Sequence, residues 1–87
     1  MKKILIIDDD ATFLKTLHDA LALDGYEVSE AEDGEAGLEM ARKEVPDLIL
    51  LDIMMPQLGG MDFLKIIKEK EDEKLQKIPV IIVSNLS

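Results

Sequence analysis

The stretch ILIIDDD, residues 4–10, decides the fold, because it joins an apolar run directly to a row of carboxylates. Two later stretches repeat this arrangement: LILL (48–51) leads into Asp52, and VIIV (80–83) leads into Ser84. Short continuous apolar runs are typical of strands covered on both faces, as in a parallel sheet with helices above and below. Ligands of such sheets bind beyond the carboxyl ends of the strands, so the polar residues after the runs mark a predicted site.

The segments between these runs carry the periodicity of helices. The pattern and its breaker residues predict strands at 3–7, 26–31, 48–51 and 79–83, and helices at 11–24, 34–44 and 60–71. With right-handed crossovers, this βαβαβαβ order predicts an α/β fold with a doubly wound parallel sheet. If the first strand lies between the second and the third, then Asp8, Asp9 and Asp52 line one crevice.

Composition narrows the classes of function. The 87 residues carry a net charge of -9, which argues against non-specific binding to nucleic acid or to an anionic membrane, since both require a basic surface. There is no cysteine, which excludes disulfides and thiolate metal sites. The first apolar run is too short for a signal-peptide core or a membrane span. We expect a single small domain, residues 1–87, in a soluble cytoplasmic chain.

Three carboxylates in one crevice create an electrostatic conflict. Two carboxylates about 5 Å apart repel by roughly 3 kcal/mol at an effective dielectric constant of about 20. A divalent cation relieves that repulsion, and a set of hard oxygen donors favours magnesium or manganese over zinc or copper. Magnesium held by a few carboxylates keeps several waters, which phosphate oxygens can replace. The crevice therefore suits phosphoryl transfer.

Several polar residues have a structural interpretation beside a functional one. Asp10 suits a helix cap as well as a metal ligand, and the sequence leaves both open. Asp33 and Asp62 lie beside glycine-containing turns and are interpreted as helix-start residues. His18 is interpreted as a solvated or partly packed histidine and not as a phosphodonor. The run of mixed charge at 68–77 is interpreted as a solvated helix end and loop.

Three stretches, in the order ILIIDDD, PDLILLDIMMP and IPVIIVSN, resemble the receiver domains of bacterial two-component response regulators. The resemblance implies a flavodoxin-like sheet of order 2-1-3-4. It also implies a phosphoacceptor module that takes a phosphoryl group from a sensor histidine kinase or a phosphotransfer protein with Mg2+. Turnover would be limited to magnesium-dependent self-phosphorylation and autodephosphorylation, so the chain is not expected to be a conventional enzyme.

The resemblance assigns roles to individual residues. It implies that Asp52 is the phosphoacceptor and also a metal ligand, that Asp9 binds the metal directly, and that Asp8 helps through water. The backbone carbonyl of Met54 matches a further metal ligand, and Ser84 matches the hydroxyl that hydrogen-bonds a phosphoryl oxygen. A phosphatase with an aspartate nucleophile is a weaker alternative, because Met54 replaces the second acid usual in such enzymes.

The sequence also departs from the family pattern. Gly59 stands where an acid is common, and Asn85 where a small residue is usual. The resemblance further implies that the usual last helix-strand-helix part is absent, together with a lysine that pairs with the acceptor. The strand at 79–83 would then be an open apolar edge, able to pair with another chain. We therefore expect a homo-oligomer or a complementary fragment at this edge, and the alternative function is a truncated receiver acting as a self-assembling building block without phosphotransfer.

Overall fold

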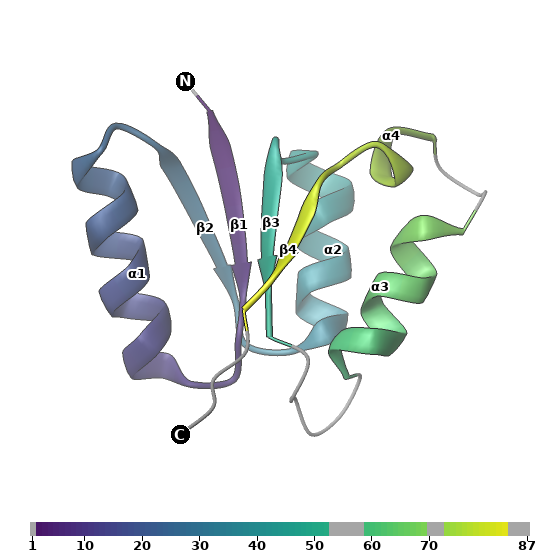
Figure 1. Cartoon of the computed structure of the whole chain (residues 1–87), viewed down its shortest axis with the longest axis horizontal. Coiled ribbons are helices and arrows are strands. Elements are labelled where there is room, and N and C mark those ends of the chain that lie inside the picture. Colours follow the sequence, from purple (N-terminus) through teal and green to yellow (C-terminus); the bar gives the residue numbers. More distant parts are fainter. Residues whose placement is uncertain (1, 53–58, 70–72, 84–87) are drawn as a thin grey trace.

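A computed structural model describes residues 2–52, 59–69 and 73–83 (Figure 1). In these ranges the elements are, in chain order, β1 (Lys3–Ile7), α1 (Ala11–Leu23), β2 (Glu27–Ala31), α2 (Gly34–Glu44), β3 (Leu48–Leu51), α3 (Gly60–Lys68), α4 (Glu73–Gln76) and β4 (Val80–Ile82). The strands form one sheet in the order β2-β1-β3-β4, and each neighbouring pair is parallel. The predicted doubly wound order 2-1-3-4 is therefore confirmed.

The central pair of strands determines where the carboxyl ends meet. All four strands run toward the same end of the molecule, and α1 begins there (Figure 1). In the register of β1 with β3, Ile7 lies opposite Leu51. The residues that follow these two positions leave the sheet side by side, at its centre.

Side chains of the two central strands alternate between two cores, as the two-residue period of a strand requires. The larger core lies on the side of α2 and α3, where Phe63 and Ile67 of α3 are buried. The smaller core joins the opposite face of β1 to Leu14 of α1. The buried strand residues of the larger core are Leu5, Ile7, Ala31, Ile49 and Leu51, and those of the smaller core are Ile4 and Ile6. Helices therefore cover both faces of β1.

Helices cover the apolar strands β3 and β4 less completely than β1. Leu48 and Leu50 of β3 are only partly buried on the α1 side, and Ile81 and Ile82 of β4 are 52% and 44% exposed. Within the described part of the chain, α1 is the helix on that face, and it packs mainly against β1 and β2. The expectation of strands covered on both faces is right for β1. On the α1 side no described helix covers β4, whereas Val80 of β4 packs against the larger core on the side of α2 and α3.

Local signals start and stop the first two helices. The side chain of Asp10 caps α1, and the side chain of Asp33 caps α2 by accepting from the N–H of Ala36 at 2.8 Å. Gly25 follows α1 with a φ of 93°, a conformation that glycine adopts without the steric cost of a Cβ. These three residues act at the positions where their residue types are favoured.

The predicted helix at 60–71 ends earlier, and the correction has a local cause. α3 stops at Lys68, because Glu69 has an extended backbone with φ -73° and ψ 159°. The carbonyl of Glu69 accepts a hydrogen bond from the side-chain amide of Gln76 at 2.7 Å. The chain therefore turns at Glu69 instead of continuing the helix.

The charged run at 68–77 is more than a solvated loop. It contains the short helix α4, which the charge pattern did not predict, and Leu75 of this helix is buried in the larger core. The ammonium group of Lys68 donates to the carbonyls of Gln76 at 3.0 Å and Ile78 at 2.9 Å. Lys68 thus ties the end of α3 to the segment that leads into β4.

Candidate functional site

The backbone ladder continues for one residue beyond the central strands and places two carboxylates next to each other. The N–H of Asp8 donates to the carbonyl of Ala31 at 3.0 Å, and the N–H of Asp52 donates to the carbonyl of Ile7 at 2.9 Å. Asp8 and Asp52 are therefore anchored by the sheet itself. Such anchoring fixes the Cα positions of both residues without any contribution from their side chains.

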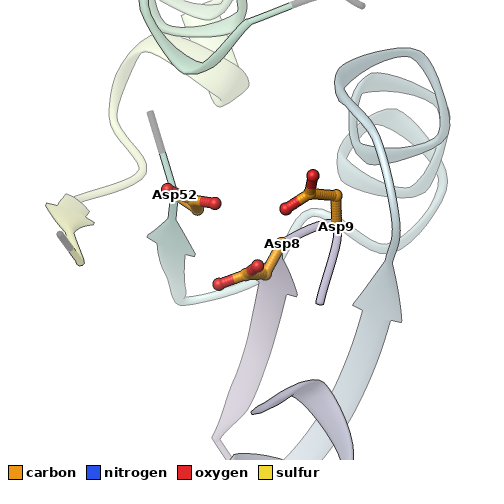
Figure 2. A group of neighbouring side chains, drawn as sticks. All are labelled: Asp8, Asp9 and Asp52. Carbon is orange, nitrogen blue, oxygen red and sulfur yellow. The ribbon is translucent and has the colours of Figure 1, made fainter. Parts of the chain in front are cut away.

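The side chains of Asp8, Asp9 and Asp52 converge at this point. One carboxylate oxygen from each lies within 4.8 Å of the others, and Figure 2 shows Asp9 and Asp52 pointing toward one another with Asp8 beside them. Asp8 and Asp52 are only 2% and 4% exposed, whereas Asp9 is exposed. The group is thus a buried acidic pair with one carboxylate at the solvent side. The sequence prediction that these three residues share one crevice agrees with this geometry.

The electrostatics of the group are unfavourable when all three side chains are ionised. Burial raises the pKa of Asp8 above its ordinary value, and a hydrogen bond from the N–H of Asp10 opposes that rise. The negative charges of Asp52 and Asp9 and a side-chain hydrogen bond with Asp52 raise the pKa of Asp8 further. The site therefore favours either a proton or a cation between the carboxylates.

The donor chemistry fits a hard divalent cation. The group offers three carboxylates, and a solvent-exposed member leaves access from outside. Oxygen donors of this kind suit Mg2+ or Mn2+, and a cation held by few carboxylates keeps water positions that a phosphate can take. Asp8, Asp9 and Asp52 could therefore hold such an ion.

Asp10 has a different position from its two acidic neighbours. Its Oδ1 accepts from the N–H of Thr12 at 3.0 Å and from the N–H of Phe13 at 3.2 Å, which is the bonding of a helix N-cap. Its own backbone N–H donates to Oδ1 of Asp8 at 2.9 Å. The sequence left a cap and a metal ligand open for Asp10, and the structure shows the cap. The bond to Asp8 was not predicted, because a backbone donor leaves no signal in residue type.

Of the other residues singled out from the sequence, Met54 and Ser84 lie outside the described residues, whereas His18 and Asp62 are described. His18 lies on α1, where its Nδ1 is hydrogen-bonded to Oε2 of Glu30; no contact between His18 and the three carboxylates is seen in the described ranges. Asp62 is in the first turn of α3, whose N-cap is Gly59.

Fold and site together define a doubly wound α/β protein with an acidic group at the carboxyl end of its central strands. The family model of the response regulator receiver domain matches residues 4–87. The chain belongs to the response regulator receiver family, a family of two-component signalling. The flavodoxin-like fold inferred from resemblance is thereby confirmed.

Individual relatives agree with this assignment. The chain is 37% identical over 86 residues to the probable transcriptional regulator ycf27 of Porphyridium aerugineum, covering 99% of this chain and 34% of that protein. It is 37% identical over 83 residues to the polar-differentiation response regulator DivK of Brucella ovis, covering 95% of this chain and 66% of that protein. The structure of the chemotaxis protein CheY4 of Vibrio cholerae superposes with a TM-score of 0.87 at 30% identity, covering 94% of this chain and 67% of that one. This chain thus spans about a third of the length of the first relative and about two thirds of the other two.

Within residues 2–52, 59–69 and 73–83, no helix has both the length and the apolar character needed to cross a bilayer.

Proposed function

We propose that this chain is a phosphoacceptor module that receives a phosphoryl group on Asp52 from a sensor histidine kinase or a phosphotransfer protein in the cytoplasm. The observation that carries the proposal is the convergence of Asp8, Asp9 and Asp52 at the ends of β1 and β3, with oxygens within 4.8 Å. Membership of the receiver family supports the choice of partner. The net charge of -9 gives no reason to expect direct contact with nucleic acid or membrane.

The proposed reaction is a transfer between two protein side chains. A carboxylate oxygen of Asp52 forms a bond to phosphorus while the bond from phosphorus to the imidazole nitrogen of a phosphohistidine breaks. The imidazole keeps the electron pair of the broken bond and takes up a proton. The product is an acyl phosphate, which water can later hydrolyse. We propose no further turnover than this self-phosphorylation and autodephosphorylation.

The remaining side chains have supporting roles in the proposal. A bound Mg2+ or Mn2+ neutralises charge on the transferring oxygens. Asp8, Asp9 and Asp52 would hold that ion together with the backbone carbonyl of Met54, and the hydroxyl of Ser84 would donate a hydrogen bond to a phosphoryl oxygen. The backbone hydrogen bonds that anchor Asp8 and Asp52 to the sheet support these roles. Carboxylates on a fixed backbone lose little conformational freedom when they bind a cation.

Incubation with acetyl phosphate and MgCl2, followed by intact-mass spectrometry, tests the proposal. We expect the native chain to gain the mass of one phosphoryl group and to lose it after hydroxylamine treatment, which cleaves acyl phosphates. Asp52→Asn, which keeps the size of the side chain but not its nucleophile, should gain nothing. The proposal would be overturned if Asp52→Asn were phosphorylated to the native level. It would also be overturned if the native chain gained no phosphoryl group with a purified histidine kinase as the donor.

The exposed edge of β4 favours a second candidate function, self-assembly. Among the described residues, β4 pairs with β3 alone, and Ile81 and Ile82 are about half exposed. A second copy of the chain can extend the sheet there, since edge amides and carbonyls are a template for pairing. The net charge of -9 opposes association, so added salt should strengthen it.

Sedimentation measurements separate self-assembly from the monomeric state. We expect the native mass to rise with protein concentration and with NaCl, and Ile81→Lys to remain monomeric under the same conditions. A monomer mass that is independent of concentration in high salt would exclude assembly through β4. This result would leave the phosphoacceptor proposal untouched.

A further inference from the structure

We infer that Asp10 is a positioning residue of the acidic site, whose side-chain cap on α1 sets the affinity of the neighbouring carboxylates for a divalent cation. The inference rests on the proposed metal site and adds to it a residue that is not itself a ligand. Two sets of hydrogen bonds meet in Asp10. Its side chain holds the first turn of α1, and its backbone N–H holds the carboxylate of Asp8.

The two sets are linked through the backbone of Asp10. This residue is extended, with φ -90° and ψ 103°, and its Oδ1 reaches forward to the N–H groups of Thr12 and Phe13. Those bonds hold the peptide that enters α1 in one orientation, and the Asp10 N–H is part of that turn. Loss of the cap would release the turn, and the N–H would no longer aim at Asp8.

The bond to Asp8 restricts the most buried carboxylate of the group. The side chain of Asp8 is 2% exposed, so little water is available to replace a donor that moves away. An N–H that engages Oδ1 at 2.9 Å also limits rotation of the carboxylate. Outer contacts of this kind orient metal ligands, and their loss typically weakens metal binding by roughly 10- to 100-fold.

A second effect of Asp10 has to be separated from the cap. Asp10 is exposed and carries a negative charge next to the cluster, which would attract a cation whether or not α1 is capped. Three substitutions divide the two effects. Asp10→Asn keeps a strong cap and removes the charge, Asp10→Glu keeps the charge with a poor cap, and Asp10→Ala removes both.

Titration with MgCl2, followed by isothermal calorimetry and by the amide NMR signals of residues 8–12, measures the outcome. We expect the Kd of Asp10→Asn to stay within about threefold of the native value, since screening by water and salt weakens an exposed charge. We expect Asp10→Glu and Asp10→Ala to bind roughly tenfold more weakly. The backbone amide signal of residue 10 should move with Mg2+ in the native chain and in Asp10→Asn only.

A matched control tests whether loss of any helix cap has the same effect. Asp33 caps α2 through the N–H of Ala36 at 2.8 Å and has no hydrogen bond to the cluster among the described residues. Asp33→Ala should lose stability as Asp10→Ala does but bind Mg2+ with the native Kd. If Asp10→Ala does not fold, Asp10→Gly replaces it, because glycine is much better tolerated than alanine at an N-cap and also lacks the side chain.

The possible outcomes distinguish a failure of the positioning role of Asp10 from a failure of the proposed metal site. Weaker binding in Asp10→Glu and Asp10→Ala, with native binding in Asp10→Asn and Asp33→Ala, supports the positioning role. Native affinity in Asp10→Ala, or a ranking that follows charge instead of the cap, overturns that role and leaves the metal site standing. Absence of saturable Mg2+ binding in the native chain overturns the proposed metal site itself.

Discussion

The charge of Asp8 opposes the fold when no cation is bound. Its side chain is almost completely buried, and its pKa is raised first by that burial and then by the nearby charges of Asp52 and Asp9. A raised pKa in the folded state means that protonated Asp8 fits the fold better than ionised Asp8. Its favourable contribution is therefore complete below the pKa of the unfolded chain and is lost as pH rises through the folded pKa.

Asp8→Asn should consequently stabilise the chain at neutral pH in the presence of EDTA. Asparagine keeps an oxygen that accepts from the N–H of Asp10 but carries no charge, so we expect a gain of about 1 to 3 kcal/mol, the size of a carboxylate repulsion at this range. Urea unfolding at a series of pH values measures it. The gain should shrink as pH falls through the raised pKa, and a gain that is constant with pH would contradict the electrostatic explanation.

Val45, at the end of α2, has a strained backbone conformation. It adopts φ 44° and ψ 67°, the left-handed conformation, which a β-branched side chain disfavours. Its side chain is 40% exposed, so packing compensates only partly. We expect Val45→Gly to raise the free energy of unfolding by about 1 kcal/mol, since glycine is the favoured residue at this position of a helix end. Thermal unfolding checks the prediction, and Val45→Ala, which keeps a Cβ, is the control that should gain less.

Packing between elements depends on a close approach of α2 to β1. A Cβ added to Gly37 would lie 2.6 Å from Cδ1 of Ile7, inside van der Waals contact, and Ile7 is fully buried. Glycine costs a helix interior roughly 1 kcal/mol relative to alanine. The close approach of α2 to β1, and not helix propensity, therefore explains why a glycine stands at position 37.

A double-mutant cycle tests this contact. Gly37→Ala alone should destabilise by up to about 2 kcal/mol, because overpacking costs about 1 to 3 kcal/mol and the better helix propensity of alanine offsets roughly 1 kcal/mol of that cost. Ile7→Val alone should destabilise by about 1 kcal/mol through loss of the terminal methyl. In the double variant the removed methyl makes room for the new Cβ, so the combined loss should be smaller than the sum. Additive losses in urea unfolding would show that the two positions do not compete for space.

The whole molecule should respond to the cation that its acidic site can hold. A ligand that binds only the folded state stabilises it by about 2.7 kcal/mol at a concentration 100 times its Kd. We therefore expect MgCl2 to raise the midpoint of urea unfolding far more than NaCl at equal ionic strength, although both screen the net charge of -9. Asp9→Asn should abolish most of the difference between the two salts. Equal effects of MgCl2 and NaCl would indicate screening alone.

Much of the architecture could be predicted from local pattern. The apolar runs that became β1 and β3, the cap at Asp33 and the turn at Gly25 follow from side-chain period, capping chemistry and the backbone freedom of glycine. For Asp10 the sequence left a cap and a metal ligand open, and the structure shows the cap. The gathering of Asp8, Asp9 and Asp52 was predicted on the condition that β1 lies between β2 and β3, an order taken from the family resemblance, because parallel strands present their carboxyl ends at one edge. These features depend on neighbours in the chain or on a rule of topology.

Other features were decided only by tertiary structure. The early end of α3, the burial of Leu75 and the bond from the Asp10 N–H to Asp8 all depend on which segments meet in space. Residue type is silent on such contacts, since a backbone N–H or a leucine in a charged run has the same identity whether it is buried or solvated. The sequence by itself therefore determined the alternating order of the four strands and of α1 to α3, and the identity of the acidic residues. Tertiary structure decided how those carboxylates are oriented and that a short helix in the charged run buries Leu75, because both result from packing between distant parts of the chain.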